Sequence, residues 1–149
     1  MRRHPPALLV LSTVLTLATL ACGDVARMTG TPEFDCANPP KERVTVAPNE
    51  LVAAFGGNVL QAETAYGGQK LLQVTGEATR VSRDDGGAFI GLRSGPIGKG
   101  KVQAYFPDAN AAAFAKVEEG QQVTVLAYLQ TGQATDKRIP LQSACLVNP

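Results

Sequence analysis

The 149-residue sequence contains no tryptophan, three cysteines and a single histidine, His4. We expect His4 to be lost with an N-terminal leader over residues 1–21. The rest of the chain would then lack the side chain that serves Ser-His-Asp and Cys-His nucleophiles, general acid–base catalysis at neutral pH and histidine-ligated zinc. A chain of this length has room for one ordinary domain rather than a two-domain enzyme. The sequence therefore predicts a protein that is not an enzyme and uses no cofactor.

Neither sign of charge is in clear excess, because 14 Lys and Arg residues face 13 Asp and Glu residues. Arg2 and Arg3 belong to the expected leader, so its removal leaves a slightly acidic chain. A dedicated nucleic-acid binder needs a basic surplus that offsets the phosphates. The charge balance therefore makes nucleic acid an unfavoured partner.

The sequence also lacks an apolar run long enough to cross a membrane. The longest uncharged apolar run covers residues 7–20, whereas a membrane-spanning helix needs about 20 such residues. The run follows Arg2 and Arg3 and ends before Gly23 and Asp24, which is typical of an export signal. A buried core helix is the alternative, but no second, polar face marks it.

The end of this run, Thr19-Leu20-Ala21-Cys22, resembles the lipobox of bacterial lipoproteins, although Thr19 stands where that motif usually has leucine. The resemblance implies cleavage before Cys22 and acylation of its thiol and new amino group, which would anchor the chain stably to a membrane. An ordinary signal peptide, cut nearby and leaving Cys22 as a spare thiol, is the alternative. Gly23 after the cysteine implies, by resemblance to enterobacterial sorting rules, the outer membrane facing the periplasm.

Residues 22–48 contain four prolines and little periodic hydrophobicity, which predicts a lipid-anchored flexible tether. If Cys22 is acylated, Cys36 and Cys145 remain as an even pair in an oxidising compartment, and we expect them to form a disulfide. Metal ligation and a redox pair are the alternatives. Two isolated cysteines have neither the spacing of a zinc site nor a CxxC pattern.

Hydrophobic periodicity predicts the elements of a domain over residues 49–149. A helical period runs from Asn49, the expected N-cap, to Tyr66 and is interrupted at Gly56-Gly57. Alternation with a period of two predicts strands over residues 72–79, 88–93, 101–106, 122–129 and 139–147, with a bend or bulge at Gly76. A turn over 84–87 and a short helix over 109–117, capped by Asp108, complete the pattern. A mainly β, five-stranded barrel with a helix between the third and fourth strands and an N-terminal helix is the OB-fold layout.

From Asn49 to Val147 the chain resembles the bacterial tRNA-anticodon-binding-like (tRNA_anti-like) family, a group of small OB-fold proteins that are often lipid-anchored or exported. The matching stretches are residues 51–55, 66–70, 74–76, 102–106, 119–125 and 141–145. Ala104 stands where members often carry a cysteine, so the resemblance implies that Cys145 needs another partner, for which Cys36 is the candidate. The resemblance implies a fold and a location but no reaction.

In OB-folds, ligands lie across the second and third strands and the loops beside them. On these strands we expect Phe89, Arg93, Lys101, Gln103 and Tyr105 to face outward. Two aromatic rings among cations could stack a base or sugar and hold an anion, and Arg80, Arg83 and Lys99 could extend the patch. The alternative is that these side chains are cross-strand pairs that protect the sheet.

These features together predict a non-catalytic lipoprotein of the cell envelope that presents an OB-fold binding module to a protein or glycan partner. Its contact with the membrane would run through the lipid anchor. The alternative is an OB-fold protein at the cell surface that binds single-stranded nucleic acid or an oligosaccharide.

Overall fold

The structure, a computed structural model, describes residues 32–96 and 101–148. These residues belong to one unit that extends from Thr31 to Pro149. The expected leader, the expected acylation site Cys22 and the candidate patch residue Lys99 lie outside the described residues. Among the residues that are described, none of the helices combines the length and the apolar character needed to cross a bilayer.

The N-terminal half of the unit begins with a short strand and two helices, β1 (Val44–Val46), α1 (Pro48–Gly57) and α2 (Val59–Tyr66). Helix α1 begins one residue before Asn49, so Asn49 is not the N-cap as expected. Pro48 instead occupies the first helical position, where its missing N–H costs nothing, and the Ala47 N–H donates to Glu50 Oε2 over 2.8 Å. The expected interruption falls at Asn58, whose side-chain oxygen accepts from the Gln61 N–H and caps α2.

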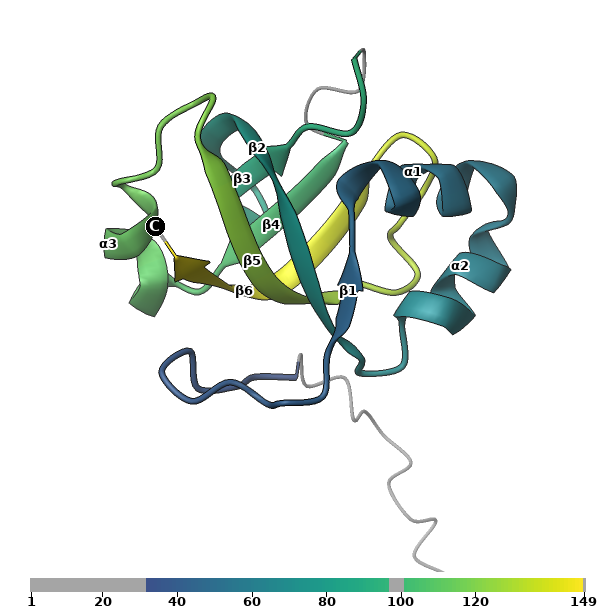
Figure 1. Cartoon of the computed structure of the whole chain (residues 1–149), viewed down its shortest axis with the longest axis horizontal. Helices are drawn as coiled ribbons and strands as arrows, with labels where there is room; N and C mark the ends of the chain where they lie inside the picture. Colours follow the sequence, from purple (N-terminus) through teal and green to yellow (C-terminus); the bar gives the residue numbers. More distant parts are fainter. Residues whose placement is uncertain (1–31, 97–100, 149) are drawn as a thin grey trace, which may run out of the picture. The chain divides into compact units, whose positions relative to one another are not determined.

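Five strands form the barrel: β2 (Leu71–Asp84), β3 (Gly87–Leu92), β4 (Val102–Phe106), β5 (Gln122–Leu129) and β6 (Ile139–Asn148). They follow one another in the sheet as β2-β3-β4-β6-β5, and the pairing of β5 with β2 closes the barrel. The β4–β6 pairing is parallel and the other barrel pairings are antiparallel. Figure 1 shows α1 and α2 on one side of these strands and α3 (Ala111–Phe114) on the other. The predicted mainly β, OB-fold-like barrel is therefore confirmed.

Within the barrel, strand β2 pairs with two other strands because it bends. Its residues 71–77 pair with β5 and its residues 78–84 pair with β3, with a register shift between Ala78 and Arg80. A bend or bulge was expected at Gly76, and the register shift lies two to four residues after it. Gly76 is needed for close approach, since a Cβ at this position would lie 2.8 Å from the Pro48 ring.

The connection between β4 and β5 is less helical than expected. It consists of the 3-10 turn η1 (Asp108–Asn110) and the four-residue helix α3 rather than a helix over 109–117. After Phe114 the hydrogen bonds tighten to a three-residue spacing, as in Val117 N–H to Phe114 O at 3.0 Å, and the helix ends. Asp108 makes no capping bond and instead lies 3.5 Å from Arg83 in an exposed ion pair. Phe114 and Val117 are buried in the core.

The interior of the barrel follows the predicted alternation. Leu72, Ile90, Leu92, Val102 and Leu141 are completely buried, and Leu51 and Phe55 of α1 pack into the same cluster. Burial of this one face fixes the register of each strand. The opposite face of β3 and β4 is thereby turned away from the core.

Three parts of residues 32–46, within the expected tether, contact the barrel: Phe34, Cys36 and Val44–Val46. Phe34 contacts Tyr128 edge to face, with ring centroids 5.7 Å apart, and covers a second buried cluster on the outer side of β2 and β5. Cys36 is joined to Cys145 of β6 by the predicted disulfide, with the two Cα atoms 5.7 Å apart. Strand β1 then runs parallel to β2. A few anchoring residues hold this segment, and these produce no periodic pattern.

Candidate functional site

The outer face of β3 and β4 carries the aromatic pair that the sequence predicts. Phe89 and Tyr105 are directly opposite each other across the two strands, with ring centroids 5.3 Å apart. Their exposed fractions, however, are only 3% and 7%. The two rings therefore form a cross-strand pair, the alternative considered from the sequence, and other side chains cover them.

Two arginines cover these rings. The Arg80 guanidinium carbon lies 5.8 Å from the centroid of Phe89, and that of Arg138 lies 5.6 Å from the centroid of Tyr105. Both contacts have the geometry of cation–π pairs. Arg80 comes from β2, whereas Arg138 comes from the loop between β5 and β6. The site therefore presents two guanidinium groups, each supported by an aromatic ring, instead of two bare rings.

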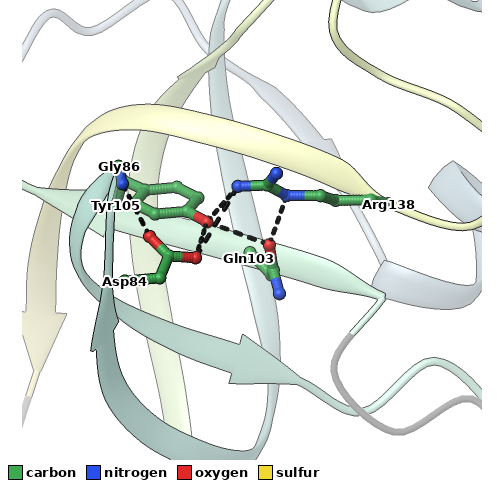
Figure 2. Close-up of polar contacts among 5 residues, drawn as sticks. All are labelled: Asp84, Gly86, Gln103, Tyr105 and Arg138. Atoms are coloured by element: carbon green, nitrogen blue, oxygen red, sulfur yellow. Dashed lines mark hydrogen bonds and ion pairs between the residues drawn. The ribbon is translucent and has the colours of Figure 1, made fainter.

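A hydrogen-bond network holds Arg138 in this position (Figure 2). Its Nε donates to Gln103 Oε1 over 2.7 Å, and its Nη2 donates to the Tyr105 hydroxyl and lies 3.7 Å from Asp84 Oδ2. The Tyr105 hydroxyl in turn donates to Asp84 Oδ2 over 2.7 Å. The Gly86 N–H donates to the other Asp84 oxygen over 2.8 Å, which ties the β2–β3 turn into the network.

This network changes the acidities of two of its members. Desolvation alone would raise the pKa of the Asp84 carboxyl, but the hydrogen bonds from Tyr105 and Gly86 and the charge of Arg138 lower the pKa below its ordinary value. Desolvation and the hydrogen bond to Asp84 raise the pKa of the Tyr105 hydroxyl. Asp84 is therefore ionised and Tyr105 neutral at neutral pH, the states in which the Tyr105–Asp84 hydrogen bond forms.

The other predicted site residues are separate from this network. Arg93 is engaged with Glu77 through two hydrogen bonds, Nε to Oε2 at 2.9 Å and Nη2 to Oε1 at 2.7 Å, and the hydrogen bond to Glu77 raises the pKa of Arg93. Lys101 donates to the carbonyl oxygen of Asp136 over 3.3 Å. The structure thus brings Phe89, Gln103 and Tyr105 together, while Arg93 and Lys101 make contacts of their own.

A hollow of about 380 Å³ lies beside the network, where Arg138 and Tyr105 form part of its wall. Its other walls include Glu33 of the N-terminal segment and three glutamines, Gln130, Gln133 and Gln142. The sequence prediction included neither Arg138 nor this hollow. The lining residues are scattered along the chain and follow no motif, so only the closed barrel brings them together.

Cys36 and Cys145 are bonded to each other, and the Asn110 side-chain amide donates to Cys36 Sγ over 3.0 Å. No group of three or more His, Cys, Asp or Glu side chains among residues 32–96 and 101–148 is placed to hold a metal ion.

Comparisons with known proteins agree with this fold. A solved structure of a candidate nucleic acid-binding lipoprotein from Klebsiella pneumoniae subsp. pneumoniae MGH 78578 is similar, with 20% sequence identity and a TM-score of 0.61, over 74% of this chain and 100% of that chain. An OBody bound to hen egg-white lysozyme is more distant, at 16% identity and a TM-score of 0.45, over 75% of this chain and 94% of that chain. No curated protein matches the chain.

The family comparison covers most of the sequence. The model of the tRNA_anti-like family matches residues 2–145, and the resemblance seen in the sequence is confirmed. The similar lipoprotein shares the fold of this family's barrel. The chain belongs to the tRNA_anti-like family.

Proposed function

We propose that this protein is a non-catalytic OB-fold binding module of the cell envelope, anchored by lipid at Cys22, and that single-stranded nucleic acid binds over the outer face of β3 and β4. The observation that carries the proposal is the pair of guanidinium groups, Arg80 over Phe89 and Arg138 over Tyr105. The similar Klebsiella protein, a candidate nucleic acid-binding lipoprotein, supports both the anchor and the ligand class.

The supported guanidinium groups offer two kinds of contact to a single strand. The planar face of each can stack on an unpaired base, which is a common mode of single-strand recognition. The edge of Arg80 can also donate two parallel hydrogen bonds to a phosphate, whereas the Nε–Nη2 edge of Arg138 is engaged by Gln103 and Tyr105. The ring beneath each arginine restricts the side chain, so less conformational entropy is lost when a ligand binds.

The charge balance limits how strong this binding can be. Glu77 engages Arg93 and Asp84 lies close to Arg138, so few cations on this face are available for phosphates. If two or three phosphates are neutralised, the logarithm of the affinity should fall with the logarithm of the salt concentration with a slope of roughly −1.4 to −2. We expect weak binding with a shallow salt dependence rather than the steep dependence of a strongly basic protein.

Fluorescence anisotropy of a labelled single-stranded DNA dodecamer, titrated with the full chain in detergent at several salt concentrations, tests the proposal. The double variant Arg80→Ala/Arg138→Ala should weaken binding at least tenfold. Its matched control is Lys41→Ala/Lys116→Ala, which removes the same charge from two exposed lysines outside the β3–β4 face. Equal losses in the two variants would indicate nonspecific charge attraction and would count against the site.

A protein or glycan partner, which the near-neutral charge favours, is the second candidate function. This second function is supported by the ion pairs of Arg93 with Glu77 and of Arg138 with Asp84, because a surface whose charges are neutralised suits an uncharged ligand. Binding of purified envelope polysaccharide in the absence of oligonucleotide binding would favour it.

Mass spectrometry of the membrane-extracted chain tests the anchor, because an unmodified Cys22 would exclude lipid attachment.

A further inference from the structure

The hollow beside Arg138 combines polar side chains from distant parts of the chain with the apolar residues Phe106 and Pro107. Gln130 and Gln133 lie in the loop after β5, Gln142 lies on β6, and Glu33 comes from the disulfide-linked N-terminal segment. The volume of about 380 Å³ lies within the range of small-ligand sites. The hollow is therefore large enough for one planar heterocyclic group.

The backbone around these glutamines is fixed. The Gln130 N–H donates to Pro140 O over 3.0 Å, and Gln142 is paired with Tyr128 across β5 and β6. The Gly132 N–H donates to Glu63 Oε1 of α2 over 2.6 Å, which ties the tip of the loop to a helix. The loop thus holds its glutamines in place without a ligand.

The three glutamine side chains have unused hydrogen-bonding capacity. Within the residues that the structure describes, none of their amide groups has a hydrogen-bond partner. Gln130 and Gln142 are nevertheless half-buried, so they are partly shielded from the water that would otherwise satisfy them. Each amide provides a donor next to an acceptor.

The charges of the hollow favour an uncharged ligand group. Arg138 lies in its wall and is already engaged by Gln103, Tyr105 and Asp84. Glu33 supplies a negative charge to the same hollow. A phosphate would be repelled by Glu33 and would have to compete with Asp84 for Arg138, whereas a neutral base meets neither cost.

We infer that this hollow is a subsite for one unpaired adenine base of the bound strand, an inference that rests on the proposed function. Adenine has a donor next to an acceptor on its Hoogsteen edge, whereas guanine has two acceptors there and each pyrimidine has a single hydrogen-bonding group. The Watson–Crick edge of adenine offers a second donor–acceptor pair. Two glutamines can therefore read adenine at the same time. The guanidinium plane of Arg138 supplies a wall on which the base stacks.

Binding of single-stranded dodecamers to the full chain tests the inference. Oligo(dA) should bind about tenfold more tightly than oligo(dT), which is within the discrimination that one bidentate base contact provides. The variant Gln133→Ala/Gln142→Ala should reduce this ratio to less than twofold and change the affinity for oligo(dT) much less. The control Gln61→Ala/Gln122→Ala removes two exposed glutamines outside the hollow and should keep the full ratio.

Oligonucleotides that contain 7-deaza-adenine separate base reading from stacking, because they lack the Hoogsteen acceptor but keep the stacking area. We expect them to bind more weakly than oligo(dA), because one glutamine contact is lost while the stacking is kept. Equal affinities for oligo(dA) and oligo(dT), or an unchanged preference in the hollow variant, would overturn the adenine subsite while leaving the proposed function intact. Failure of every oligonucleotide to bind would overturn the proposed function and the subsite together.

Discussion

Loss of the Cys36–Cys145 disulfide is expected to destabilise the folded unit strongly. The bond closes a loop across a sequence separation of 109 residues, and a loop of about a hundred residues is worth roughly 4.7 kcal/mol in the chain-entropy model. Typical domains have a total unfolding free energy of about 5–15 kcal/mol. The variant Cys36→Ser/Cys145→Ser should therefore lose a third or more of its stability.

Urea denaturation of the full chain, followed by circular dichroism, measures this loss. With a denaturant slope of about 1–3 kcal/mol/M, the midpoint should fall by at least about 1.5 M relative to the native chain, and a chain treated with a dithiol reductant should behave like the variant. Cys22→Ser is the matched control and should keep the midpoint. A change below about 0.3 M would refute the reasoning, because it would mean that the N-terminal segment is held as well without the bond.

Three further predictions concern the site and its surroundings. Asp84→Asn should make the free energy of unfolding fall less steeply in acid. The pKa of Asp84 is lowered in the folded protein, so the ionised carboxylate stabilises the fold above the unfolded pKa of about 3.9, and this contribution is lost as the pH falls through the folded pKa. Thermal unfolding between about pH 2 and pH 6 measures the difference. Gly86→Ala should cost about 1–3 kcal/mol in urea unfolding, because its Cβ would lie 2.9 Å from the Tyr105 ring, which is buried and hydrogen-bonded. Gly56→Ala, with no atom within 4 Å, should be neutral or stabilising. Phe34→Ala should lower the free energy of unfolding by about 1–2 kcal/mol, because it removes the half-buried ring that contacts Tyr128. An unchanged urea midpoint would contradict a stabilising contact between the N-terminal segment and the barrel.

Local patterns predicted the barrel well because each strand buries one face. The alternation from Gln122 to Leu129 gave the bounds of β5 without error, and the turn at residues 84–87 and the interruption near Gly57 were also placed correctly. Helix ends were less accurate. Pro48 begins α1 although Asn49 is the better capping residue, because the proline packs against Gly76, a contact that spacing along the chain does not reveal.

The site was predicted only in part, because its surface depends on contacts between distant residues. The sequence indicated which side of the sheet carries Phe89 and Tyr105, since alternation determines direction. It could not indicate that Arg138, 33 residues after Tyr105 in the chain, covers the ring. The disulfide of Cys36 and Cys145 was predicted, but the low periodicity of residues 32–46 gave no sign that Phe34 contacts Tyr128.

The central claim is that the outer face of β3 and β4 binds a single strand, and nuclear magnetic resonance of the ¹⁵N-labelled chain tests it most directly. On titration with a single-stranded oligonucleotide, the account predicts the largest chemical-shift changes at Arg80, Phe89, Gln103 and the side-chain Nε–H of Arg138. Saturating oligonucleotide that leaves these signals unchanged, or changes confined to the surface around Phe34 and Tyr128, would contradict it.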